Sequence, residues 1–133
     1  MTDTATLQTY LDEAPLHAAI GDLSVRVDGD DVVIEGTLAA ASENGAATGV
    51  AHGGALATLL DTALAFALIV RDDRDWSTVD LRVDYLRPMG IAEVSVRAWV
   101  VQAGRRTGRA EGEVRDGSGA VCASAVGTFI PLD

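Results

Sequence analysis

The sequence predicts an α+β domain in which one antiparallel β-sheet curls around a single long helix. The helix is predicted by the segment from Gly54 to about Val70, which is apolar on most of its circumference and needs covering on more than one side. The sheet is predicted by the strand patterns that fill the chain after this helix, because Gly-containing turns between such strands are typical of an antiparallel meander. At 133 residues, the chain is expected to form one domain, residues 1–133, with its own core.

The elements before and after this helix can be placed in order. A short amphipathic helix is expected from about Thr4 to His17, where Pro15 disturbs it. Two strands around the turn 28–31 are expected in 23–41, and residues 42–54 are rich in small and turn-forming types, which predicts a loop. The later strands are expected in 77–88, 91–104, 106–116 and 119–132.

The first of the later strands has a strict alternation. Its odd positions from Val79 to Tyr85 are apolar or aromatic, and its even positions from Asp80 to Asp84 are charged. Strand residues point alternately to opposite faces, so the odd positions are expected on one face of the sheet and the even positions on the other. A sheet of this kind wrapped around one helix is the hotdog fold.

Composition excludes several classes of function. All ten basic residues are Arg, so a Schiff-base lysine, a P-loop lysine and a lysine general base are excluded. The net charge of −10, without a basic stripe, argues against a nucleic-acid partner. A local Arg cluster would still suit a small polyanion.

The single cysteine and the two histidines limit the chemistry further. Cys122 permits no internal disulfide, which suits a reducing cytoplasm, and its strand context predicts a buried small residue. With only His17, His52 and Cys122 available, no zinc site is expected. The N-terminal segment lacks an apolar signal region, and the apolar run Ala55–Val70 is shorter than the roughly 20 residues that span a bilayer. We therefore expect a cytoplasmic protein without a membrane segment.

The stretch "HGG" lies where the loop becomes the long helix. Gly53 and Gly54, after His52, allow another group to approach the backbone, and a helix N-terminus presents free N–H groups and a positive dipole. Such a terminus can hold a carbonyl oxygen or an oxyanion. Glycine at a helix start is also common for structural reasons alone.

Asp61 lies in the middle of the apolar helix, where a carboxylate is costly unless it has a partner. Asp61 follows Gly53 by eight residues, about 12 Å along the helix axis, so the two cannot meet within one chain. They would meet if two such helices packed antiparallel across a homodimer, which would form two composite sites. The structural alternative is a hydrogen bond that Asp61 accepts from a neighbouring Thr or backbone group.

The segments "GVAHGGALATLLDTALAFA" and "TVDLRVDYLRP" resemble the PaaI-type hotdog acyl-CoA thioesterases. Members of that family carry H-G-G, an Asp nine residues after the His, and later a strand that ends in R-P. The resemblance extends from about Leu23 to Phe129. It implies hydrolysis of an acyl-CoA thioester in a homodimer or homotetramer, without a metal or a cofactor beyond the coenzyme A of the substrate.

The resemblance also implies a role for each matching residue. The Gly53 amide polarises the thioester carbonyl, and Asp61 of the facing subunit acts as nucleophile or as general base on water. Thr78 positions that water, and His52 shapes the loop and contacts the substrate near the thioester. Gly54 is expected to lie against the substrate.

The chain departs from the family pattern at Ala46, where many members have Asn or Gln six residues before the His. Asn44 would take that role if the loop carries two extra residues; otherwise the donor is missing. The phosphates of coenzyme A need cations, and Arg87, Arg105 and Arg106 are the candidates, although a turn and a strand edge also hold solvated arginines.

Two other functions on the same scaffold are alternatives. The segment "DEAPLH", residues 12–17, partly resembles the D-x-N-P-L-H motif of hotdog enoyl-CoA hydratases, but Ala14 replaces the Asn and the segment precedes the first strands. A non-catalytic acyl-CoA-binding protein is the other alternative. Phe66, Trp76 and Tyr85 are expected either to line an acyl pocket or to pack in the core.

Overall fold

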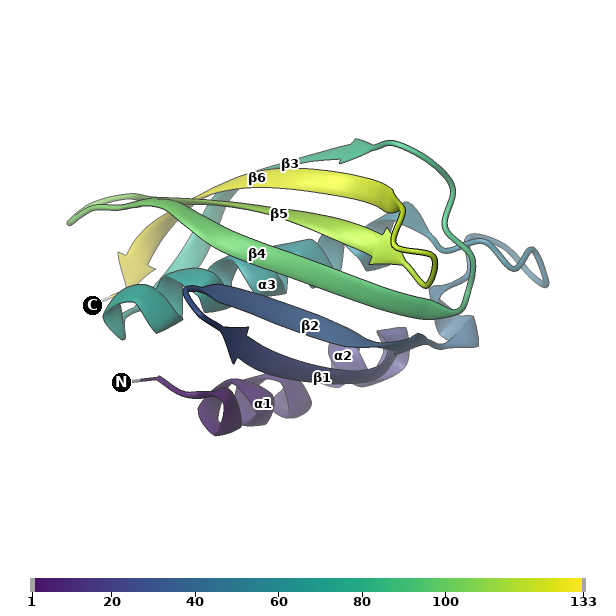
Figure 1. Ribbon diagram of the computed structural model, residues 1–133, viewed down its shortest axis with the longest axis horizontal. Helices are drawn as coiled ribbons and strands as arrows, with labels where there is room; N and C mark the ends of the chain where they lie inside the picture. Colours follow the sequence, from purple (N-terminus) through teal and green to yellow (C-terminus); the bar gives the residue numbers. More distant parts are fainter. Residues whose placement is uncertain (1, 133) are drawn as a thin grey trace.

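The structure is a computed structural model that describes residues 2–132, so the predicted domain 1–133 extends one residue beyond it at each end. Two short helices precede a strand hairpin, a long helix follows a loop, and four strands complete the chain (Figure 1). The elements are α1 Thr4–Glu13, α2 Pro15–Ile20, β1 Gly21–Asp28, β2 Asp31–Leu38, a 3₁₀ turn Ala40–Ser42, α3 Gly53–Asp72, β3 Asp75–Tyr85, β4 Glu93–Ala103, β5 Gly108–Asp116 and β6 Val121–Leu132.

The strands form one six-stranded sheet in the order β1-β2-β4-β5-β6-β3, with every neighbouring pair antiparallel. The sheet curves over α3, as Figure 1 shows, and α3 contacts β2, β3, β4, β5 and β6. The predicted hotdog fold is therefore confirmed. Two glycines allow the close approach of helix and sheet, because a Cβ at Gly112 or Gly127 would lie 2.8–2.9 Å from the Leu64 side chain.

The N-terminal helical segment differs from the single helix predicted for residues 4–17. α1 ends at Glu13, and α2 begins at Pro15 and continues to Ile20. Proline suits the first position of a helix but breaks the interior of one, so the chain restarts at Pro15 instead of only bending there. Leu7 and Leu11 of α1 are buried in the core.

The long helix begins one residue earlier and ends two residues later than predicted. α3 spans 20 residues and ends at Asp72, and the C-cap residue Asp73 that follows has a φ of 58°, the left-handed conformation common at helix C-termini. Its length and composition alone would allow it to cross a bilayer, as they do for the core helix of many folded domains, and 44% of its apolar window is buried in the structure.

The alternation predicted for β3 is wrong at Val79. Thr78 pairs with Phe129 and Asp80 pairs with Thr128, so Val79 is an extra residue in a β-bulge and its side chain is 59% exposed. The bulge reverses the facing of the residues that follow it. Thr78 and Leu81 therefore both face α3, which an unbroken alternation would not allow.

Candidate active site

Asp61 lies on the face of α3 that the sheet of the same chain does not fully cover, and the residue is half-buried. The Thr78 hydroxyl of β3 donates a hydrogen bond of 2.7 Å to Asp61 Oδ1. A hydrogen bond with a neighbouring Thr was the purely structural explanation for Asp61, and this contact fits it. The same contact joins the two residues to which the family resemblance gives roles in one reaction. The bulge at Val79 makes the contact possible, because it turns Thr78 toward the helix.

The N-terminus of α3 has one free amide. His52 is the N-cap, and its Nδ1 accepts a hydrogen bond of 2.9 Å from the Gly54 amide. The Tyr85 hydroxyl donates to the Gly53 carbonyl at 2.6 Å, and no described residue accepts a hydrogen bond from the Gly53 amide. The Gly53 N–H is therefore available to a carbonyl oxygen, whereas that of Gly54, predicted to lie against substrate, is committed to His52.

Replacing His52 by Ala is expected to destabilise α3, because the Gly54 amide loses its acceptor. The expected loss in the free energy of unfolding is about 1 kcal/mol, as for other helix caps. Denaturant unfolding of the two chains measures it. An unchanged midpoint would show that the cap contributes no stability.

Gly53 and Asp61 do not meet in one chain. Both lie on α3, eight residues apart, which is about 12 Å along the axis of a regular helix. The structure contains a single chain, so the homodimeric and homotetrameric assemblies stay predictions.

The predicted role of Asn44 is not visible in the single chain. Its side-chain oxygen accepts from the Thr48 hydroxyl at 2.7 Å, and its backbone amide donates to the Val50 carbonyl, so it holds the loop together. No hydrogen bond within residues 2–132 joins Asn44 to the start of α3. Ala46 is exposed in the same loop.

The three predicted phosphate-binding arginines do not form one cluster. Arg87 follows β3, and its amide donates to the Cys122 carbonyl. Arg105 and Arg106 lie in the β4–β5 turn, where the Arg105 carbonyl accepts from Arg74. Of the three, only Arg87 lies near the Gly53 end of α3, because it follows Tyr85 by two residues and the Tyr85 hydroxyl donates to the Gly53 carbonyl.

The Cys122 side chain is fully buried, as predicted. Burial raises the pKa of its thiol, and the nearby Asp116 carboxylate adds to this effect. The cysteine therefore stays a neutral thiol at neutral pH.

A groove of about 560 Å³ passes alongside Asp61, and among the lining residues that were not predicted as site residues, two come from the start of the chain. They are Tyr10 and His17 of the N-terminal helices. The sequence indicated only His17, which belongs to the partial hydratase resemblance at residues 12–17. Nothing in the neighbouring sequence shows which helix His17 contacts. His17 Nε2 lies 2.9 Å from the Thr62 hydroxyl, beside Asp61.

The comparison with known families decides the membership of the chain. A sequence model of the thioesterase superfamily matches residues 48–123, which is more than half of the chain and includes His52, Gly53, Asp61 and Thr78. The chain belongs to the thioesterase superfamily.

Relatives and solved structures agree with this membership. A variant of the phenylacetic acid degradation protein PaaI from Thermus thermophilus is 33% identical and has a TM-score of 0.77, over 90% of this chain and all of that one. A thioesterase from Haemophilus influenzae is 18% identical with a TM-score of 0.87, over all of this chain and 92% of that one, which shows the shared fold.

A putative esterase from Saccharolobus solfataricus is 30% identical over 83 residues, 62% of this chain. The match covers 55% of the length of that esterase, so this chain spans only about half of it. The superfamily match supports hydrolysis of a thioester as the general reaction.

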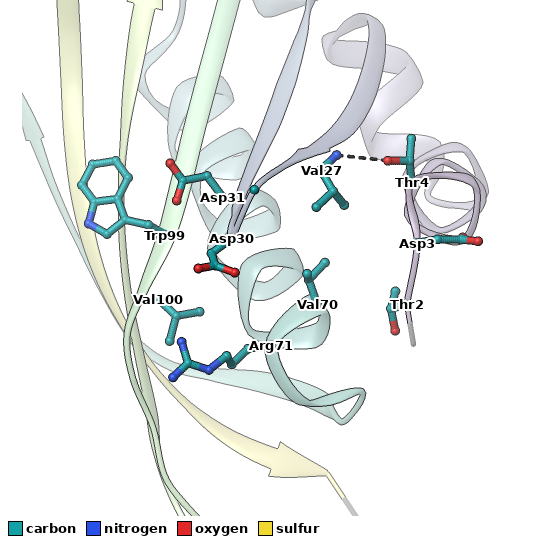
Figure 2. Close-up of a pocket in the computed structure, with 11 residues that line it drawn as sticks. Thr2, Asp3, Thr4, Val27, Asp30, Asp31, Val70, Arg71, Trp99 and Val100 are labelled. Atoms are coloured by element: carbon teal, nitrogen blue, oxygen red, sulfur yellow. Dashed lines mark hydrogen bonds between the residues drawn. The ribbon is translucent and has the colours of Figure 1, made fainter.

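The chain also has a larger cavity, of about 680 Å³, and Asp61 is not among the residues that line it. Figure 2 shows its lining residues, which come from the start of α1, the β1–β2 turn, the end of α3 and β4. Thr4 there accepts a hydrogen bond from the Val27 amide. Within residues 2–132, no group of three or more His, Cys, Asp or Glu side chains is arranged to hold a metal ion.

Proposed function

We propose that this protein hydrolyses acyl-CoA thioesters to free acids and coenzyme A, in composite sites formed by a homodimer. The observation that carries the proposal is the pairing of Asp61 with Thr78 on the open face of α3, in a chain whose Gly53 amide has no acceptor among the described residues. The carboxylate and the amide are the two groups that attack on a thioester carbonyl requires. The superfamily match supports the reaction class.

The chemistry follows from the hydrogen bond to Thr78. Because Thr78 holds Asp61 Oδ1, the other carboxylate oxygen is free to act. It either takes a proton from water, which attacks the carbonyl carbon, or attacks that carbon itself and forms an anhydride that water then hydrolyses. In both routes the carbonyl oxygen becomes an oxyanion, and the Gly53 amide of the facing subunit stabilises it until the carbon–sulfur bond breaks.

The remaining features of the proposal follow from this scheme. The leaving thiolate needs little assistance, and no metal or further cofactor is required. Arg87 is the arginine best placed to contact the phosphates of coenzyme A, since it follows the end of β3, where the Tyr85 hydroxyl donates to the Gly53 carbonyl. The proposed setting is the cytoplasm, and the proposed assembly is a homodimer or a tetramer of two such dimers, with no nucleic-acid or membrane partner.

A panel of acyl-CoA esters, assayed with a reagent that detects free thiol, tests the proposal. We expect thiol release from at least one ester, with equal amounts of free acid. Enoyl-CoA consumed without thiol release would show a hydratase instead, and acyl-CoA bound without turnover would show a binding protein. After single-turnover hydrolysis in ¹⁸O-labelled water, label in the Asp61 carboxylate would show that Asp61 itself attacked. Water then opens the anhydride at the Asp61 carbonyl carbon, and the acid product leaves with the unlabelled Asp61 oxygen.

A further inference from the structure

The groove beside Asp61 has one wall that comes from the N-terminal helices. Tyr10 and His17 form this wall, and residues of α3, β3 and the end of β6 line the rest, with Phe66, Ile69 and Trp76 among them. We propose that this groove holds an apolar acyl group and that the wall of Tyr10 and His17 determines which acyl groups are hydrolysed. This inference rests on the proposed function.

The position of the groove relative to the reacting carbon points to the acyl group. In the proposed dimer, Gly53 of one helix faces Asp61 of the other, so the two helices overlap between these positions and the reacting carbon lies at Asp61. The rest of α3, from Thr62 to Ile69, lies beyond this overlap and forms the floor of the groove. Asp61 and Ile69 are eight residues apart, about 12 Å along the helix axis, which is long enough for a medium-length acyl chain.

The lining of this part is mainly apolar. The Tyr10 and Phe66 rings are 6.5 Å apart between centroids and tilted by 52°, and Phe66 is buried whereas Tyr10 is 40% exposed. The exposed part of the Tyr10 ring is therefore open to the groove. Trp76 closes the opposite side, and its indole N–H is already bonded to Asp72, so it presents carbon atoms to a ligand.

His17 fixes this wall to α3. Its Nδ1 lies 2.8 Å from the Leu11 carbonyl, which can only accept, so Nδ1 carries the proton. In the neutral ring, Nε2 then accepts from the Thr62 hydroxyl at 2.9 Å. The ring thus connects the end of α1 to the helix turn that carries Asp61, and His17 acts as a positioning residue.

Replacing Tyr10 by Ala tests the wall with butanoyl-CoA and octanoyl-CoA. Because only the longer chain reaches Tyr10, we expect kcat/KM for octanoyl-CoA to fall about tenfold more than that for butanoyl-CoA. α1 should remain folded, since Ala favours a helix and Leu7 and Leu11 anchor it in the core. Leu16→Ala is the matched control: Leu16 lies on α2, is 57% exposed and does not line the groove, so both values should stay unchanged.

Thr62→Val tests the connection through His17. Valine keeps the shape of Thr62 and removes the hydroxyl, so we expect the octanoyl-to-butanoyl ratio of kcat/KM to fall about fivefold. The inference would be overturned if either variant lost kcat/KM equally for both esters or lost none. It would also be overturned if the wild-type chain hydrolysed butanoyl-CoA but not octanoyl-CoA. Absence of thiol release from every ester by the wild-type chain would instead refute the proposed function itself.

Discussion

Replacing Asp61 by Asn is expected to lower kcat for acyl-CoA hydrolysis by about 10²–10⁴-fold, the range that a general base contributes. The amide neither takes a proton from water nor attacks a carbonyl at neutral pH. Its side-chain oxygen can still accept the hydrogen bond that Thr78 donates to Asp61, so the fold and the assembly should be preserved. Steady-state kinetics with the best ester of the panel measure the change.

A second carboxylate on β3 provides the control for this variant. Asp80 is exposed and lies next to the bulge, but it does not line the groove. Asp80→Asn changes the net charge by the same amount and should leave kcat unchanged. Circular dichroism and gel filtration should show the same fold and size for all three proteins. Turnover of Asp61→Asn at the wild-type rate would refute the proposed mechanism.

The fold could be predicted because the helical pattern of apolar residues and the alternating pattern of the strands both persist over long segments. α3 has a single charged residue, Asp61, in its apolar run before Arg71, and the last three strands alternate around clear turns. The order of these elements leaves few ways to cover the helix other than one curled sheet. The sequence predicted a disturbance of the first helix at Pro15 but not a second helix after it. Proline also suits the first position of a new helix, and α2 begins there.

The parts of the site that are local in sequence could also be predicted. The Gly53 amide at the helix start and the position of Asp61 eight residues later follow from one short stretch. The bulge at Val79 could not be predicted, because Val79 fits the alternation and only its pairing with β6 makes it the extra residue. The contact of His17 with Thr62 joins residues 45 positions apart, which no local pattern encodes.

The second large effect is expected at Gly53, where proline removes the amide hydrogen and keeps the helix. Gly53 is the first residue of α3, a position that tolerates proline. His52 already has φ −66° and ψ 132°, the conformation favoured before proline. Loss of one oxyanion donor typically lowers kcat by about 10²–10³-fold. We expect this decrease for Gly53→Pro.

Gly53→Ala is the matched control, because it adds a Cβ and retains the amide. That Cβ would lie 3.0 Å from the Tyr85 ring, whose exposed end can move aside. Any loss of activity in Gly53→Ala measures crowding at this point. The ratio of kcat between the Ala and Pro variants then reports the amide alone, and a ratio near one would show that the amide does not stabilise the oxyanion.

Mixing the Asp61→Asn and Gly53→Pro chains tests whether the two residues act across subunits. A heterodimer has one site with both substituted residues and one site with the native Gly53 of one chain and the native Asp61 of the other. Random exchange makes half of the dimers heterodimers, so about one quarter of all sites regain the wild-type pair. We expect activity to rise to about one quarter of the wild-type value after exchange, whereas sites confined to one chain would stay inactive even when exchange is demonstrated by mass spectrometry.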